Sequence, residues 1–515
     1  GNKNVFIDDA AGRCRDSGSN NIAIGPDSLR GSNTADANTG ACNIAIGNAS
    51  GLNVTSGSNN VLIGNCAGYS VTSGSLYVAI GCEALFSEDT AGTGAVAIGR
   101  RALYNQNGPW SHNVAVGDCA GNAITQATEN TFMGYHAGKG VTTGCANVAI
   151  GSLTLNATTT GGQNVVIGGD AGRSNTGSSN VIIGHASLTS SGSGHSNVMV
   201  GKSAGFAITD GHSNTFIGAQ AGGQQATMTG GNNTILGMQA MQYATSAAGN
   251  ISIGWDSANA LTTGDYNIFM GYSAGSNTTD VDYSVIIGFQ AGNGVMTSDA
   301  DGTIAIGYQA GNAITTGVQN TVIGYEAMKT GNNIQYNTVI GYQAWTLAPA
   351  GANHNVVIGA GAGAGVSANS DSNIIIGSAA GTGGGASLMG VIAIGNNALN
   401  STAANAQTGT IAIGHDALTS LTSGAGNLAI GYEAMKVHTT GGNNITIGYG
   451  AMDDTDAGST SLGSSDNIFI GYDAGGGTWA DAASTNNIAI GNYSMDAAMN
   501  GAVRNIALGW AALTS

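Results

Sequence analysis

Few side chains in this sequence have the types and spacing that metal chemistry requires. His195 and His212 occupy the same place in consecutive repeats, but two imidazoles do not complete a metal site and no further ligand is obvious. Acidic pairs with one residue between them occur in expected loops, at Asp280/Asp282, Asp299/Asp301 and Asp454/Asp456. None continues into the glycine-anchored ligand series of an EF-hand loop. We predict solvated turn residues and no cofactor, with calcium in these loops as the alternative.

Catalytic constellations are not indicated by the residues either. A glycosidase needs two carboxylates several ångströms apart in a cleft, and no segment of the sequence suggests such an arrangement. We therefore predict that the protein is not an enzyme.

The element that positions all these residues is a short motif repeated from Asn4 to the last residues. The copy at 337–344 reads Asn-Thr-Val-Ile-Gly-Tyr-Gln-Ala, or Asn followed by three apolar residues, Gly, two variable residues and a small one. Counting Asp8 in place of the first glycine, the motif occurs 29 times, most often 17 residues apart. A period this short is typical of a solenoid. Positions are numbered below from the motif glycine as zero.

The apolar residues of each copy indicate a strand. Positions −3 and −1 have strand spacing and are rich in β-branched residues, so we expect both to face the interior. The glycine at zero and a frequent second glycine at −7 permit bends, which predicts two short strands and two turns per coil. The sequence thus predicts an all-β parallel β-solenoid, a β-roll of about 29 coils of ~17 residues forming a single domain over 1–515. We expect neighbouring modules to cover the open strand edges at both ends.

Asparagine occupies position −4 in most copies. Coils stacked at strand spacing, about 4.8 Å, would place equivalent amides one above the next, where they can hydrogen-bond along the stack. We predict a turn-stabilising ladder, with a ligand-binding amide row as the alternative. The members of this ladder include Asn147, Asn164, Asn180, Asn197 and Asn214.

Position −2 lies between the two positions expected inside, yet it is apolar in nearly every copy. A strand that is apolar on both faces is buried on both faces. We therefore expect position −2 to face outward and to contact identical chains. The predicted interface residues include Phe132, Ile182, Phe216, Phe269, Val339, Ile375 and Phe469.

Composition restricts the partners and the compartment. The net charge of −17 argues against nucleic acid or an anionic membrane surface, and no apolar run is long enough to cross a bilayer. None of the six cysteines forms a CxxC pair, so no zinc site is predicted. Cys66 and Cys82 fall at neighbouring positions of consecutive coils, where either a disulfide or two small packed thiols fits the spacing.

Receptor contacts are expected on inserted loops and on one aromatic row. The loops carry Trp110, Trp345 and Trp479, and large exposed aromatics are frequent anchors for sugars and proteins. The alternative is that each indole folds back over its own coil. Position +1 is aromatic in five consecutive copies, where the row either stacks against sugar rings or packs on itself. These residues are Tyr272, Phe289, Tyr308, Tyr325 and Tyr342.

Copies such as Asn-Val-Ala-Ile-Gly at 147–151 and Asn-Ile-Ala-Ile-Gly at 43–47 resemble the head repeats of trimeric autotransporter adhesins. Gly-Tyr-Gln-Ala-Gly at 307–311 is similar to repeats of bacteriophage tail-fibre proteins. The resemblance implies a left-handed parallel β-roll, a homotrimer and an extracellular place on a virion fibre or a bacterial cell surface. It also implies attachment to a cell-surface glycan or protein receptor. The coil here is longer than the autotransporter type, and Asn replaces Ser at −4.

Two other functions fit a repeat of this kind. A structural extracellular filament or surface-layer subunit would form head-to-tail polymers, whereas an adhesin would be a finite trimer. An ice-binding solenoid would need a flat row of regularly spaced Thr, and the Thr pairs of this sequence drift in position.

Overall fold

A computed structural model describes most of the 515-residue chain. The described residues are 3–14, 17–33, 37–88, 92–108, 112–158, 160–190, 192–224, 227–366, 370–385, 387–402, 405–454, 463–479 and 482–514. The chain divides into two compact units, Gly1–Ile253 and Gly254–Ser515. The prediction of one domain over the whole chain stays a prediction. The fold is an all-β parallel β-solenoid with about 28 turns of ~17 residues and almost no helix.

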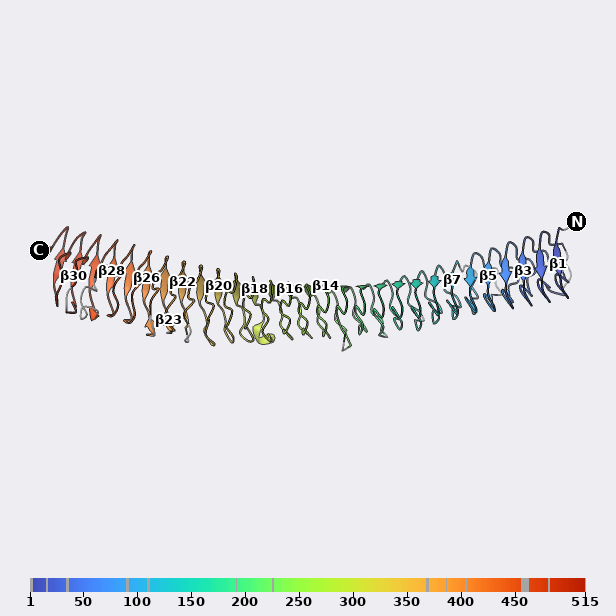
Figure 1. The fold of residues 1–515 in the computed structure, drawn as a ribbon, viewed down its shortest axis with the longest axis horizontal. Coiled ribbons are helices and arrows are strands. Elements are labelled where there is room, and N and C mark those ends of the chain that lie inside the picture. The colour runs from blue at the N-terminus through green and yellow to red at the C-terminus, as the bar shows by residue number, and fades with distance from the viewer. Residues whose placement is uncertain are drawn as a thin grey trace. The chain divides into compact units, whose positions relative to one another are not determined.

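Unit 1 contains one three-residue strand per turn (Figure 1). Its strands are β1 (Val5–Ile7), β2 (Ile22–Ile24), β3 (Ile44–Ile46), β4 (Val61–Ile63), β5 (Val78–Ile80), β6 (Val96–Ile98), β7 (Val114–Val116), β8 (Thr131–Met133), β9 (Val148–Ile150), β10 (Val165–Ile167), β11 (Val181–Ile183), β12 (Val198–Val200), β13 (Thr215–Ile217), β14 (Thr234–Leu236) and β15 (Ile251–Ile253).

Unit 2 has the same organisation, with one short 3₁₀ helix and two additional two-residue strands. Its elements are β16 (Ile268–Met270), β17 (Val285–Ile287), η1 (Ser298–Ala300), β18 (Ile304–Ile306), β19 (Thr321–Ile323), β20 (Thr338–Ile340), β21 (Val356–Ile358), β22 (Ile374–Ile376), β23 (Leu388–Met389), β24 (Ile392–Ile394), β25 (Gln407–Thr408), β26 (Ile411–Ile413), β27 (Leu428–Ile430), β28 (Ile445–Ile447), β29 (Ile468–Ile470), β30 (Ile488–Ile490) and β31 (Ile506–Leu508).

Within each unit the strands of consecutive turns pair in parallel and in register, as the row of arrows in Figure 1 shows. In unit 2, for example, Val339 of β20 pairs with Val357 of β21. Equivalent repeat positions therefore stack directly on one another. The repeat and its strand were thus predicted correctly from the apolar spacing.

The prediction of two strands per coil is wrong for the described residues. Each turn has one strand, and the return segment forms turns, six isolated bridges and the β23–β25 pair. The reason is visible around Gly341, where Tyr336, Gln343 and Trp345 have φ of 58°, 50° and 46°. Three left-handed residues per turn bend the chain too often for a second regular strand.

The faces of the strand are the reverse of the sequence prediction. In β8, Phe132 at −2 is 0% exposed, whereas Thr131 at −3 is half-buried and Met133 at −1 is 47% exposed. The residues predicted to face other chains are therefore core residues. All of them are buried, namely Phe132, Ile182, Phe216, Phe269, Val339, Ile375 and Phe469. The interior of so small a turn accepts one side chain from each strand, and that side chain comes from the middle residue.

Position +4 supplies the complementary volume inside the turn. Where −2 is Ala, position +4 is mostly Leu or Met, as in Ala149 with Leu155. Where −2 is Phe, position +4 is Gly in every case, and a Cβ on Gly138 would lie 2.6 Å from the ring of Phe132. The Phe–Gly pairs are Phe6–Gly12, Phe132–Gly138, Phe216–Gly222, Phe269–Gly275 and Phe469–Gly475. In most layers at least one of the two positions supplies a large side chain, as close packing requires, whereas Ala45, Ala115 and Ala305 are combined with Gly at +4.

Candidate functional site

The predicted aromatic row forms one continuous stack in unit 2. Ring centroids from Tyr272 through Phe289, Tyr308 and Tyr325 to Tyr342 are 5.1, 5.3, 4.8 and 5.3 Å apart, with ring planes within 13° of parallel. Trp255, which the sequence reasoning did not name, contacts Tyr272 at 4.6 Å between ring centroids, with its ring tilted by 41°. The parallel, in-register turns cause this arrangement because they repeat position +1 at strand spacing.

This stacking limits what the aromatic column can bind. Ring faces inside the stack cover one another, so neighbours expose mainly ring edges to solvent. A sugar ring stacks on a free aromatic face. Tyr342 has such a face because Ala360 follows it at position +1, and Tyr342 is 57% exposed against 44% for Tyr325. The receptor-contact role of the row stays a prediction, and the geometry favours its end ring.

The tryptophans predicted to stand in exposed loops do not do so. Trp345 is 2% exposed and Trp479 is 0% exposed, so both fold back over their own turns, which corrects the prediction. Trp345 occupies the inward position +4. The Trp479 indole packs edge-on against Phe469, at 5.6 Å between ring centroids, and its Nε1 donates to the carbonyl oxygen of Gly475. Trp110 lies outside the described residues.

The asparagine ladder is confirmed as a structural feature. The Oδ1 of Asn147 accepts the backbone N–H of Asn164 at 3.0 Å and its Nδ2–H at 3.0 Å, and the Nδ2 of Asn147 donates to the carbonyl oxygen of Gly161. The same pattern continues through Asn180 and Asn197. The row continues through Asn214, which donates its backbone N–H to Asn197 and accepts the backbone N–H of Asn233. Because these buried amides already have partners, none is left for a ligand.

The residues considered for metal binding take other roles. His195 and His212 stack at 5.4 Å with an interplanar angle of 8°. Within the described ranges, no three His, Cys, Asp or Glu side chains gather closely enough to hold a metal ion.

The carboxylates of the acidic loop pairs accept backbone N–H groups from neighbouring turns. Asp280 accepts from Ser298, and Asp301 accepts from Asp282. Burial raises the pKa of the Asp301 carboxyl above its usual range. Asp454 accepts from the hydroxyl of Thr478, whereas Asp456 lies outside the described residues. These contacts assign Asp280, Asp301 and Asp454 a turn-stabilising role, and Asp299 has no such contact among the described residues.

The cysteines are free thiols. Cys66 is half-buried and Cys82 is exposed, and no disulfide joins them. Burial, followed by the proximity of Cys82 and Glu83, raises the pKa of the Cys66 thiol. Of the two alternatives that the spacing left open, the structure has the unbonded thiols.

Two repeats spell Gly-x-Ser-x-Gly, a pattern of hydrolase nucleophiles that the sequence reasoning wrongly took to be absent. The serines, Ser203 and Ser273, have left-handed φ of 55° and 48°, as do most residues at position +2. Ser273 donates to Asp256 at 3.5 Å, and neither hydroxyl is hydrogen-bonded to a histidine among the described residues. A serine nucleophile needs such a base, so the match is explained by the repeat itself.

A buried polar cluster in unit 1 also went unpredicted. The Nε2 of Gln106 donates to Glu88 at 3.2 Å, and the Nδ2 of Asn113 donates to the Oε1 of Gln106 at 2.9 Å. Tyr77 and Ala95 replace Asn at −4 in the two turns before Asn113, which interrupts the ladder there. Gln106 thus replaces the missing amide oxygen. The signal in the sequence was the loss of Asn from two successive copies.

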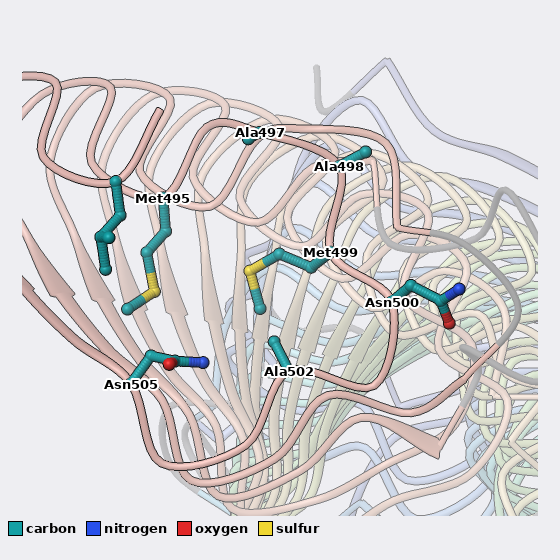
Figure 2. Close-up of a pocket in the computed structure, with 8 residues that line it drawn as sticks. Met495, Ala497, Ala498, Met499, Asn500, Ala502 and Asn505 are labelled. Atoms are coloured by element: carbon teal, nitrogen blue, oxygen red, sulfur yellow. The ribbon is translucent and has the colours of Figure 1, made fainter. Parts of the chain in front are cut away.

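Described residues of unit 2 line two pockets. The first, of about 220 Å³, is lined mainly by apolar residues of the last turns, and Figure 2 shows Met495 and Met499 pointing into it. Met495 and Leu513 are position +4 residues, so this pocket continues the packed interior. The second, of about 420 Å³, is polar and lies beside η1. The sequence reasoning missed it, although the interval between Gly288 and Gly307 is longer than usual.

Among the residues that the structure describes, no helix is both long enough and apolar enough to cross a membrane. No protein-family model and no curated protein matches the chain.

Proposed function

We propose that the chain is a non-enzymatic segment of an extracellular attachment fibre or adhesin, which assembles with identical chains. The observation that carries this proposal is the outward face of the strands. In each unit, positions −3 and −1 form two rows of mostly aliphatic side chains that are half-buried or exposed, such as Met133 at 47% and Ile490 at 42%. The sequence reasoning expected such a row, but assigned it to position −2.

A continuous apolar surface of this kind supports assembly. Soluble monomers rarely expose apolar patches above a few hundred Å². Burying the exposed half of one aliphatic side chain contributes roughly 1 kcal/mol. A dozen such side chains would offset much or all of the roughly 4–15 kcal/mol cost of association. A closed homo-oligomer buries the rows without further polymerisation, and the resemblance to trimeric heads favours three chains.

The rest of the surface is compatible with attachment. The aromatic column and the polar pocket beside η1 lie away from the outward strand rows in the repeat, at positions +1 and −9 to −6. A glycan or protein receptor on a cell surface is the partner class that the resemblance implies, and an extracellular location on a virion or a bacterium follows from it.

The second candidate is a structural filament or surface-layer subunit, because the same apolar rows would serve a polymer. Ice binding has less support. Threonine hydroxyls on the return segment donate to carbonyl oxygens of the next turn, as Thr262 does to Thr279 and Thr422 to Thr439, so their geometry follows the protein backbone.

The test measures the mass of the assembled chain and its attachment to cells. We expect light scattering of the chain at micromolar concentration to give the mass of a trimer. Val356→Glu with Ile374→Glu places charges at paired outward positions of β21 and β22 and should loosen that assembly. The matched control is Thr at both positions, because Thr321 and Thr338 occupy the same place naturally, and it should assemble.

Attachment itself is measured with the fluorescently labelled chain on panels of bacterial and animal cells. A monomer mass for the unmodified chain refutes the assembly. Open-ended polymers would favour the filament instead. A well-formed trimer that attaches to no cell would refute the adhesin function.

A further inference from the structure

The polar pocket of unit 2 has an unusual lining. Its volume is about 420 Å³, and polar side chains from three successive turns surround it. They are Ser298, Asp299, Thr316, Asn333 and Gln335, and Gly317 and Val318 complete the lining. Val318 is the one apolar side chain among these lining residues, whereas the usual small-molecule site is lined mostly by hydrophobic side chains.

A local insertion creates this pocket. Gly288 and Gly307 are 19 residues apart, whereas the next two intervals, to Gly324 and Gly341, are 17 each. The additional residues accompany η1, which projects from the row of turns next to β18 in Figure 1. The wall formed by η1 stands beside two regular turns, and the space between them is the pocket.

The base of the pocket is held by the backbone. Gly317 N–H donates to Asp299 O, Ile334 N–H to Thr316 O and Gly351 N–H to Asn333 O. These bonds join the turns that carry the lining residues, so the side chains project from a fixed frame. Preorganised polar groups lose little freedom on binding, which favours affinity.

Four of the lining side chains have unused hydrogen-bond donors or acceptors. Those of Asp299, Thr316, Asn333 and Gln335 make no hydrogen bond to any other described residue, in contrast to the ladder asparagines. Together they offer a carboxylate acceptor, a hydroxyl and two amides, each amide with donors and an acceptor. Neighbouring donors and acceptors of this kind match vicinal hydroxyl groups, which donate and accept at once.

We propose that this pocket binds one pyranose unit of an uncharged glycan through its vicinal hydroxyls, and this inference rests on the proposed attachment function. Turns repeat at about 4.8 Å, so side chains two turns apart start roughly 10 Å apart and can reach both edges of a single sugar ring. A peptide anchor would need an apolar pocket instead.

The negative charge in and near the pocket favours neutral sugars over anionic ones. Asp299 lines the pocket, Asp301 and Asp282 lie near it, and no Lys or Arg side chain lines it. Together with the net charge of −17, this arrangement repels sialic and uronic acids. Neutral hexoses and N-acetylhexosamines carry no such penalty.

The test is a saturation-transfer NMR titration of the full chain. The probes are the methyl glycosides of mannose, galactose, glucose and N-acetylglucosamine, with methyl sialoside as the anionic comparison. At least one neutral glycoside should bind with a Kd in the millimolar range, and the sialoside should not. Asp299→Asn should weaken binding at least tenfold, because it replaces a charged acceptor oxygen by an amide donor, and Asn333→Ala should weaken binding at least threefold, because it removes an amide that contacts the ligand.

Matched controls exist at the same repeat position, −8, in unit 1. Asp210→Asn changes the charge as Asp299→Asn does, and Gln126→Ala truncates an exposed amide as Asn333→Ala does. Both controls should bind like the unmodified chain, and circular dichroism should be the same for all variants. The proposal is overturned if no neutral glycoside binds, or if the pocket variants bind as tightly as their controls.

The same variants separate this inference from the proposed function. If the chain attaches to cells and Asp299→Asn attaches equally well while no glycoside binds, the pocket proposal fails and attachment stands. If the glycosides bind the pocket but the chain attaches to no cell, the pocket stands and the attachment function fails.

Discussion

The pairing of volumes at positions −2 and +4 predicts a strong compensation between two substitutions in one turn. Phe269 of β16 is fully buried, and a Cβ on Gly275 would overlap its ring. Phe269→Ala empties the layer and should cost about 3–5 kcal/mol. Gly275→Leu alone overfills it, which costs about 1–3 kcal/mol in addition to the strain of a left-handed residue.

The double variant recreates the combination found at Ala149 and Leu155. There Leu155 has a φ of 46°, so this fold accommodates leucine in the left-handed conformation. We expect the double variant to be destabilised by only about 1–2 kcal/mol, less than either single variant. The coupling between the sites should therefore amount to several kcal/mol.

Hydrogen exchange of the intact chain measures these effects turn by turn, since a repeat protein of this length need not unfold in one step. Each 1.4 kcal/mol corresponds to about tenfold faster exchange, so Phe269→Ala should accelerate amides of β16 and β17 by on the order of 100-fold or more. Peptides of unit 1 serve as the internal control. If the double variant exchanges as fast as Phe269→Ala, the two positions do not share one space and the reasoning fails.

Two further predictions concern buried polar groups. Neither amide atom of buried Gln407 has a partner among the described residues, so Gln407→Leu should stabilise β25 and β26 by about 1–3 kcal/mol, seen as slower hydrogen exchange. The control is Gln106→Leu, which loses hydrogen bonds to Glu88 and Asn113 and should speed hydrogen exchange. Faster exchange in Gln407→Leu as well would contradict the expected stabilisation. Burial lowers the pKa of the His438 imidazole from 6.5 to about 4, so the unfolded chain binds more protons between these values. Stability near β27 and β28 should therefore fall by on the order of 2–3 kcal/mol as pH drops through this window. His438→Leu, which copies Leu421 of the preceding turn, should remove this pH dependence of stability. If the variant and the unmodified chain show the same hydrogen exchange against pH, the dependence does not come from His438.

The sequence reasoning predicted the repeat, its strand and its asparagine ladder because each depends on local spacing alone. It could not orient the strand, because positions −3, −2 and −1 are all apolar and their alternation carries no contrast. The missing information was present elsewhere in the repeat. Phe at −2 always accompanies Gly at +4, and Ala mostly accompanies Leu or Met, which marks both positions as one shared interior.

The same rule explains the error at Trp345. The residue was assigned to a loop, although it stands at +4, where other turns place Leu or Met. The polar pocket was harder to foresee. It depends on how η1 packs beside regular turns, and two additional residues do not specify that conformation. Its lining residues were visible in the sequence only as separate polar residues of three repeats.

The motif glycines have a consequence for the history of the gene. Each has a φ that favours glycine, 138° at Gly324 for example, and a Cβ on Gly324 would overlap the carbonyl oxygen of Gly341. Because nearly every turn meets its neighbour through the same glycine contact, the junction left by deleting or duplicating one repeat is again a native junction. Unequal recombination between copies can therefore change the number of turns in a single event without a misfolded intermediate. The number of turns can therefore vary without a new kind of junction, whereas a side chain on a junction glycine such as Gly324 would overlap the next turn.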